Sequence, residues 1–64
     1  MFLEFDNSII NTNAVSEFMR INQDGKFKIV ALRTDGSYMG SESFDTVNER
    51  ETRMSDIYNG LKEN

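Results

Sequence analysis

Hydrophobic and polar residues alternate along the middle of the chain on either side of two Asp-Gly pairs. Asp24-Gly25 separates VSEFMRI from KFKIVALR, and Asp35-Gly36 separates KFKIVALR from SYMGSESF. Asp-Gly favours a type I′ hairpin turn, because both central residues need a positive φ and these two residue types tolerate it. The flanking β-branched and aromatic runs therefore predict a three-stranded antiparallel meander over about residues 15–21, 26–33 and 37–44.

The chain ahead of this meander carries two further patterns. Phe2–Phe5 and Ile9–Asn11 are expected to form a short hairpin around Asp6-Asn7-Ser8. The segment 13–20 also fits a helix, because its apolar residues are spaced like one helical face and Asn13 can cap it. We favour the strand, because the first Asp-Gly pair needs a partner strand to complete its hairpin.

The C-terminal segment has the period of an amphipathic helix. Thr46-Val47-Asn48-Glu49 fits a capping box, in which the Thr46 hydroxyl accepts the amide of Glu49 and the Glu49 carboxylate reaches back to the Thr46 amide. Asn59-Gly60 is expected to end the helix, since glycine adopts the left-handed conformation without penalty. A helix over about residues 46–59 is therefore predicted. Its expected buried face consists of Val47, Met54, Ile57, Tyr58 and Leu61.

The central strand of the meander is apolar on both faces, because side chains alternate along a strand. One set is Phe27, Ile29 and Ala31, and the other is Lys28, Val30 and Leu32. With two-residue turns, the first face also carries Phe18, Tyr38 and Phe44, and the second also carries Val15, Met19, Ile21 and Met39. One C-terminal helix covers only one face, and we expect it on the phenylalanine face. The predicted fold is a single α+β domain over residues 1–64: an antiparallel meander of three to five strands with one C-terminal α-helix packed on one face.

The second face must be covered by the N-terminal segment, by another copy of the protein or by a partner. The simplest arrangement folds the N-terminal apolar residues over it, namely Phe2, Leu3, Phe5, Ile9 and Ile10. A face left uncovered indicates an interaction surface, since large exposed apolar patches are unusual on monomers. The candidate interaction face consists of Met19, Ile21, Val30, Leu32 and Met39.

The composition limits the ways in which a chain of 64 residues can be stabilised. Cysteine and histidine are both absent, which removes disulfides, zinc sites of the usual kind, thiol nucleophiles and imidazole bases. Self-association is the remaining way to add stability to a domain with a small core. The absence of cysteine also favours a reducing cytoplasm, and no stretch approaches the roughly 20 apolar residues that span a membrane. We therefore expect a cytoplasmic homo-oligomer with no membrane partner.

Candidate catalytic and ligand-binding motifs fail on particular residues. No Ser-x-x-Lys or Gly-x-Ser-x-Gly motif is present. The segment 22–27 is similar to the centre of a calcium-binding loop, but Arg20 occupies the first ligand position and Ala31 the position of the bidentate glutamate. We expect no enzyme, no metal site and no cofactor.

Basic residues around the central hairpin support an alternative function. Arg20, Lys28 and Arg33 are interleaved with Phe18 and Phe27, as in platforms that bind single-stranded nucleic acid. The net charge of −4 and the nearby carboxylates oppose that function, because nucleic acid attracts a basic field. The first hypothesis is therefore a non-enzymatic protein-interaction module that binds itself or a host protein. The alternative is a small nucleic-acid-binding accessory protein.

Three segments resemble a recurrent plan: Ile9-Ile10-Asn11-Thr12-Asn13, then DGKFKIVALRTDGS, then Phe44-Asp45-Thr46 ahead of a charged helix. This plan is similar to short uncharacterised proteins of Gram-positive bacteria and their phages. The resemblance implies an accessory protein of a phage or mobile element that acts by binding. The chain departs from the plan at Gly40 and Gly60, where an unbroken strand and an unbroken helix are typical.

Overall fold

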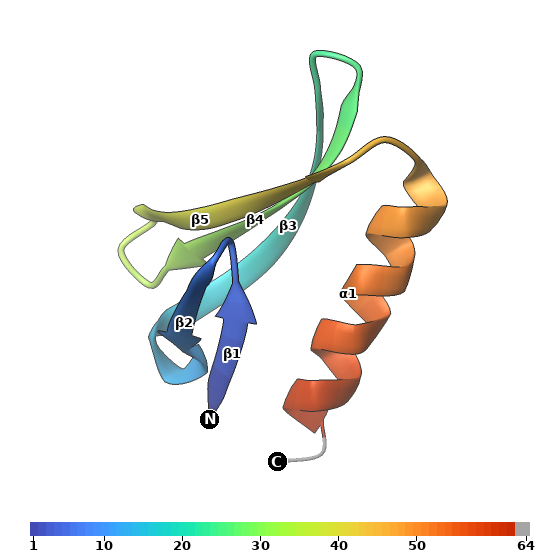
Figure 1. Ribbon diagram of the computed structural model, residues 1–64. Helices are drawn as coiled ribbons and strands as arrows, with labels where there is room; N and C mark the ends of the chain where they lie inside the picture. Colours follow the sequence, from blue (N-terminus) through green and yellow to red (C-terminus); the bar gives the residue numbers. More distant parts are fainter. Residues whose placement is uncertain (63–64) are drawn as a thin grey trace.

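The computed structural model describes residues 1–62, which form five antiparallel strands and one α-helix (Figure 1). The elements are β1 (Phe2–Phe5), β2 (Ser8–Asn11), a 3-10 turn (Thr12–Ala14), β3 (Val15–Gln23), β4 (Lys26–Arg33), β5 (Tyr38–Phe44) and α1 (Val47–Lys62). β1 and β2 form one hairpin, and the other three strands form a separate sheet in the order β3-β4-β5. The predicted α+β fold with a meander and a C-terminal helix is confirmed, and the segment 15–23 is a strand.

Two of the three hairpin turns have two residues, as predicted at Asp24-Gly25. The N-terminal turn was expected around Asp6-Asn7-Ser8, but Ser8 already belongs to β2 and pairs with Phe5. Asp24 and Gly25 have φ values of 53° and 74°, as a type I′ turn requires. Asp6 and Asn7 adopt the same conformation between β1 and β2, with φ values of 53° and 61°. These positive φ values suit Asp, Asn and Gly better than other residue types, because their small or self-bonding side chains tolerate the left-handed region.

The turn between β4 and β5 differs from the prediction. Gly36 has a φ of 85°, whereas Asp35 does not enter the left-handed region. The Arg33 amide donates to the Ser37 carbonyl at 2.8 Å, and the Gly36 amide donates to the Arg33 carbonyl at 2.9 Å. The loop therefore has three residues and closes on a left-handed glycine, which is the next most common hairpin geometry. The two-residue type I′ turn predicted at Asp35-Gly36 is wrong.

A β-bulge in β5 compensates for this extra loop residue. Ala31 faces Gly40, but the next residue of β4, Leu32, faces Tyr38 and leaves Met39 unpaired. Met39 consequently packs against the buried core, while Tyr38 shares the outer face with Leu32. The predicted positions of Tyr38 and Met39 are therefore reversed, because a bulge interrupts the alternation of side chains.

A second bulge lies at the start of β3. Glu17 faces Leu32, but Val15 faces Arg33, so Ser16 is the extra residue. Val15 packs against the buried core and not on the outer face where it was expected. The cause is the same as in β5, since one inserted residue moves the preceding side chain to the other face of the sheet.

The N-terminal hairpin and α1 both pack on the inner face of the meander. Phe5 of β1 and Ile57 of α1 join Ile29 and Ala31 of β4 in one buried cluster, in which each residue is at most 3% exposed. The Phe5 ring also meets the Phe18 ring edge to face at a centroid distance of 5.5 Å. The helix thus covers the phenylalanine face, as predicted. The expectation that the N-terminal residues cover the opposite face is wrong.

The start of α1 follows the predicted cap, but its end does not. The Glu49 amide donates to Thr46 Oγ1 at 3.2 Å, and the Thr46 hydroxyl donates to Glu49 Oε1 at 2.9 Å. The Glu49 carboxylate therefore bonds the capping hydroxyl, in place of the Thr46 amide. The helix continues through Gly60 to Lys62, so the predicted stop at Asn59-Gly60 is wrong. Leu61 packs against the buried core, and this contact favours the extra turn over the glycine preference.

The buried stripe of α1 runs differently from the predicted one. Val47 and Tyr58 are 44% and 64% exposed, so they do not belong to it. The residues that face the sheet are Arg50, Met54, Ile57 and Leu61. A charged residue therefore occupies the first position of an otherwise apolar stripe.

Candidate interaction face

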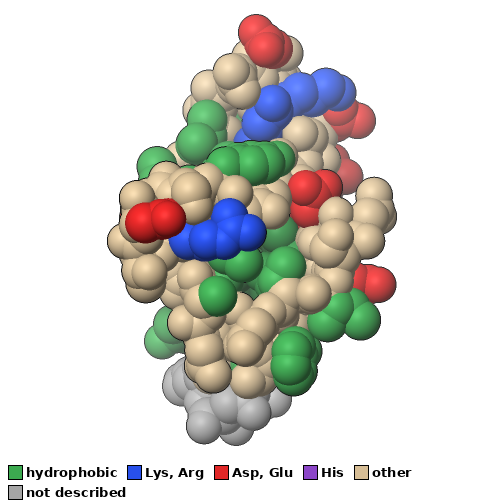
Figure 2. Space-filling view, turned by 90° about the vertical axis from the view of Figure 1, so that its left-hand side faces the viewer, with side chains coloured by type: hydrophobic (Ala, Val, Ile, Leu, Met, Phe, Trp, Pro, Cys, Tyr) green, Lys and Arg blue, Asp and Glu red, His purple; other side chains and the backbone are tan. Residues whose placement is uncertain are grey.

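The outer face of the meander carries the second set of apolar side chains. Met19 and Val30 face each other across β3 and β4, and Leu32 faces Tyr38 across β4 and β5. With Ile21 they form what we call the open face, on which Tyr38 is 60% exposed and the other four are half-buried. Figure 2 shows the side of the molecule away from α1, with hydrophobic side chains at its centre and basic side chains among them. Four of the five predicted interaction residues lie here, and Met39 does not.

Opposite charges lie at the two ends of the open face. Glu17 faces Leu32 at one end, and Lys28 faces Ile21 at the other. Lys28 Nζ donates to Gln23 Oε1 at 3.1 Å. The Glu17 side chain is exposed. The face is therefore an apolar strip with an acidic end and a basic end.

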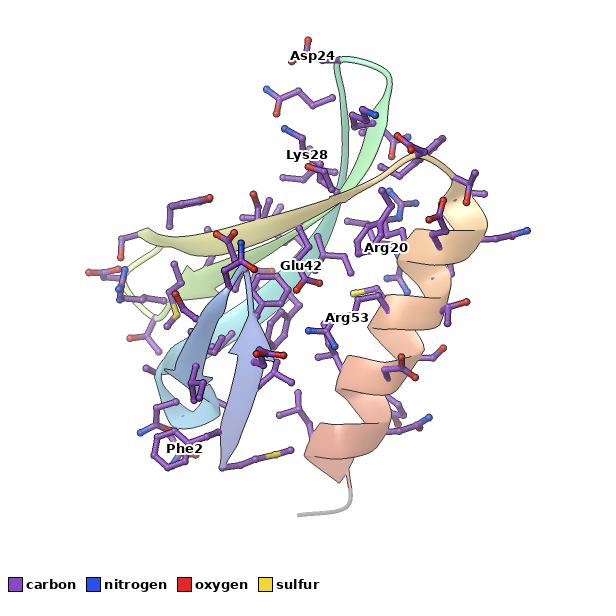
Figure 3. The ribbon with its side chains drawn as sticks, in the orientation of Figure 1. Phe2, Arg20, Asp24, Lys28, Glu42 and Arg53 are labelled. Carbon is purple, nitrogen blue, oxygen red and sulfur yellow. The ribbon has the colours of Figure 1, made fainter. Side chains whose placement is uncertain are left out.

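The three basic residues that suggested nucleic-acid binding do not converge. Arg20 points toward α1, where its Nε donates to both oxygens of Glu51 at 2.9 Å. Lys28 lies on the opposite side of the meander (Figure 3). Arg33 lies near the β4–β5 turn, where its Nη1 donates to Ser37 Oγ at 3.3 Å and to the Tyr38 carbonyl at 2.9 Å.

A polar cluster joins β3 to the first turns of α1. Arg50 is buried at 8% exposure, and its Nη1 donates to Asn22 Oδ1 at 2.7 Å while its guanidinium lies 5.4 Å from the centroid of the Phe27 ring. Its Nε donates to Glu51 Oε2 at 3.0 Å, so Glu51 bridges Arg50 and Arg20. Desolvation raises the pKa of Glu51, but hydrogen bonds from both arginines outweigh it and lower that pKa below its ordinary value.

A second polar cluster joins three elements around Glu42 (Figure 3). Arg53 of α1 donates from Nε to Glu42 Oε1 at 2.8 Å and from Nη2 to the Glu4 carbonyl at 2.6 Å. The Asp6 amide donates to Glu42 Oε2 at 3.2 Å. The Arg53 guanidinium also lies 5.9 Å from the centroid of the Phe5 ring. These contacts fasten the N-terminal hairpin to both the meander and the helix, and we had not expected them from the sequence.

Gly40 allows the N-terminal turn to approach β5. The Ser41 amide donates to Asp6 Oδ2 at 3.1 Å. A Cβ atom at Gly40 would lie 3.0 Å from that oxygen and 3.1 Å from Asp6 Cβ, closer than such atoms normally come. Glycine at position 40 therefore permits this close approach, next to the bulge at Met39.

Ion pairing and turn hydrogen bonds shift the pKa values of three further groups, Lys26, Asp45 and Asp35. Lys26 Nζ pairs with Asp45, which raises the pKa of Lys26 and lowers the pKa of Asp45. Hydrogen bonds from the Ser37 side chain and amide lower the pKa of Asp35. These groups are exposed and stabilise turns and strand ends.

Two open depressions carry polar groups. One of about 430 Å³ is lined by Asp6, Asn7, Ser41, Glu42, Ser43, Phe44 and Arg53. Another of about 360 Å³ is lined by Arg20, Met54, Ser55, Tyr58 and Asn59. The two carboxylates that line the first depression, Asp6 and Glu42, accept hydrogen bonds from neighbouring groups of the protein. Within residues 1–62, no three metal-ligating side chains gather, and no helix is long and apolar enough to cross a membrane.

Comparison of the chain with models of protein families, with curated proteins and with solved structures found no match. The meander followed by a C-terminal helix agrees with the plan that the sequence resembles. The open face is consequently the feature from which a function is inferred.

Proposed function

We propose that this chain is a protein-interaction domain that self-associates through the open face. One observation carries the proposal: the N-terminal hairpin and α1 both cover the inner face, so the outer face keeps a strip of apolar side chains in contact with solvent. Exposed apolar surface of this kind is typical of binding sites. Met19 at its centre is flexible and polarizable, which suits an adaptable contact.

A second copy of the chain is the occupant that the face fits. In a two-fold interface the same patch meets itself, so an antiparallel arrangement brings the Glu17 end of one copy to the Lys28 end of the other. The described residues also form a small core, with four buried apolar side chains, and domains of this size often gain stability by association. The resemblance to short phage and bacterial proteins supports an accessory role in a phage or mobile element that is exerted by binding.

Size-exclusion chromatography with light scattering tests this proposal. At high micromolar concentration we expect a mass near twice the 7.4 kDa of one chain. Val30→Glu should return the mass to that of one chain while circular dichroism shows an intact fold, because a charge in the middle of a dehydrated contact is costly. Thr52→Glu, the same change of charge on the exposed side of α1, should leave the mass unchanged.

Two results would contradict the proposal. One is a mass that stays at that of one chain at every concentration. The other is equal behaviour of the Val30→Glu and Thr52→Glu variants. Salt-dependent retention of an oligonucleotide at low ionic strength would favour the nucleic-acid alternative instead.

A further inference from the structure

The two edges of the meander are not equivalent. At the β5 edge, Asp6 Oδ2 accepts the outward amide of Ser41. The β3 edge runs over the nine residues Val15–Gln23. Within residues 1–62, the only strand that pairs with β3 is β4, and no side chain bonds the main-chain groups that β3 turns away from it.

The register identifies these outward groups. A two-residue turn makes the residues next to it, Gln23 and Lys26, a hydrogen-bonded pair. Bonded and non-bonded pairs then alternate along an antiparallel ladder, so Phe18, Arg20 and Asn22 direct their N–H and C=O groups away from β4. Such a row is a template for another strand. The lysines and prolines with which proteins commonly protect an edge are absent from β3.

We propose that β3 pairs antiparallel with β3 of a second copy, about a two-fold axis that passes through Met19. In this register Met19 faces Met19 of the second copy, and Val15 faces Gln23, so all nine residues of each strand are opposed. Phe18 and Arg20 of opposite copies exchange main-chain hydrogen bonds, and each guanidinium lies beside an aromatic ring, which is a favourable contact.

Neighbouring registers are less favourable. A shift of the axis to Arg20 opposes two arginines directly, and like charges in that position destabilise a sheet. A shift to Phe18 leaves Asn22 and Gln23 without an opposing strand residue. The bulge at Ser16 lies outside the central block 17–21, which is regular and maps onto itself in the proposed register.

This inference goes beyond the proposed function, because it concerns the main chain of one strand and not the side chains of the open face. Both contacts can exist in one assembly, since they use different surfaces. Either one can also fail without the other, and the experiments below distinguish the two failures.

Disulfide trapping tests the pairing directly, because the chain has no cysteine of its own. In the proposed register Met19 and its counterpart form a non-hydrogen-bonded pair, with Cα atoms about 4.5 Å apart, inside the range of roughly 4.4–6.8 Å that a disulfide spans. Met19→Cys should therefore yield a covalent dimer under mild oxidation. Ile21→Cys and Val30→Cys should not, since their counterparts lie more than about 10 Å apart along or across the strands. Equal cross-linking of Met19→Cys and either control overturns the proposal, as does no cross-linking of Met19→Cys.

Two substitutions of Arg20, one of which also removes a main-chain N–H group, provide a matched comparison in the Met19→Cys background. Arg20→Pro and Arg20→Ala both remove the ion pair with Glu51, but only proline removes the outward N–H of β3. Proline is tolerated at such an edge position. We expect cross-linking to be roughly tenfold slower with proline than with alanine, the change that loss of about one or two hydrogen bonds produces. Equal rates in two variants that circular dichroism shows to be folded overturn the proposal.

The open face is tested separately with Val30→Glu. Cross-linking of Met19→Cys that persists when Val30→Glu is added supports edge pairing, even if the proposed function is wrong. A two-chain mass that Val30→Glu abolishes, without cross-linking of Met19→Cys, overturns edge pairing and leaves the proposed function standing.

Discussion

Glu42 of β5 and Arg53 of α1 form a half-buried ion pair, with 2.8 Å between Oε1 and Nε. The pair also holds the N-terminal hairpin, because the Asp6 amide donates to Glu42 and the Glu4 carbonyl accepts from Arg53. Helix, meander and hairpin therefore meet at one carboxylate. This point of contact lies beside the buried cluster that contains Phe5.

Removal of this carboxylate is expected to destabilise the whole domain. Glu42→Ala should lower the free energy of unfolding by about 1–3 kcal/mol, because Arg53 Nε and the Asp6 amide both lose their acceptor and only the bond from Arg53 Nη2 to the Glu4 carbonyl is kept. Urea denaturation measures this loss. Glu4→Ala removes an exposed carboxylate nearby and should change stability by less than about 0.5 kcal/mol. Similar losses in the two variants would show that Glu42 contributes no more than an ordinary surface charge.

The close approach of Asp6 and Gly40 predicts an unusual response to alanine. Gly40→Ala should destabilise the protein by about 1–3 kcal/mol, because the new methyl group would lie 3.0 Å from Asp6 Oδ2. Asp6→Gly removes that side chain and suits the φ of 53° at this position. In the Asp6→Gly background the Gly40→Ala change should cost little, as measured by a double-mutant cycle of denaturation midpoints. An undiminished cost would mean that the strain comes from elsewhere in β5.

The lowered pKa of Glu51 predicts a loss of stability in acid. The folded state favours the charged carboxylate, so its contribution is present above the ordinary pKa of 4.5 and is lost as the pH falls through the lowered folded value. The stability of the wild type should therefore approach that of Glu51→Gln as the solution is acidified. Denaturation of both proteins across this range measures the difference. A difference that stays constant well below pH 4.5 would contradict the assignment.

The cap of α1 predicts a specific dependence on a hydroxyl group. Thr46→Ala should lower the free energy of unfolding by about 1 kcal/mol, because the Glu49 amide loses its acceptor. Thr46→Ser keeps that hydroxyl and should retain most of the stability. Thermal unfolding compares the three proteins, and equal losses with alanine and serine would show that the cap is not the source.

The elements of this fold could be predicted because their signals are local. Asp24-Gly25 set one hairpin and its register, and the spacing of Met54 and Ile57 indicated the helix. A glycine inside a strand, as at Gly40, suggests a bulge, but the inserted residues Ser16 and Met39 could not be identified, since an inserted residue leaves no mark in an alternating pattern that is apolar on both faces. Side chains near each bulge were therefore assigned to the wrong face.

The candidate site was only partly predictable for a related reason. The register of the β3–β4 hairpin followed from its turn, and this register placed Met19, Val30 and Leu32 on the same face of the sheet. The position of the N-terminal hairpin depends on contacts between residues far apart in the chain, such as Phe5 with Ile57, and no local pattern encodes them. One signal was present: Glu42 faces the buried Ile29, and a charge on the inner face requires a partner.

The hydrogen bond between Asp6 and the Ser41 amide bears on how far the proposed pairing of β3 strands could extend. A sheet that is open along both edges can add copies without end, and such growth produces fibres. Here the outward amide of Ser41 at the β5 edge already has an acceptor within the same chain, so a further strand would have to displace Asp6 to bond that amide. If two molecules pair along β3 as proposed, each β3 row is used once, and further growth of the sheet would have to begin at the β5 edges, where Asp6 bonds the Ser41 amide.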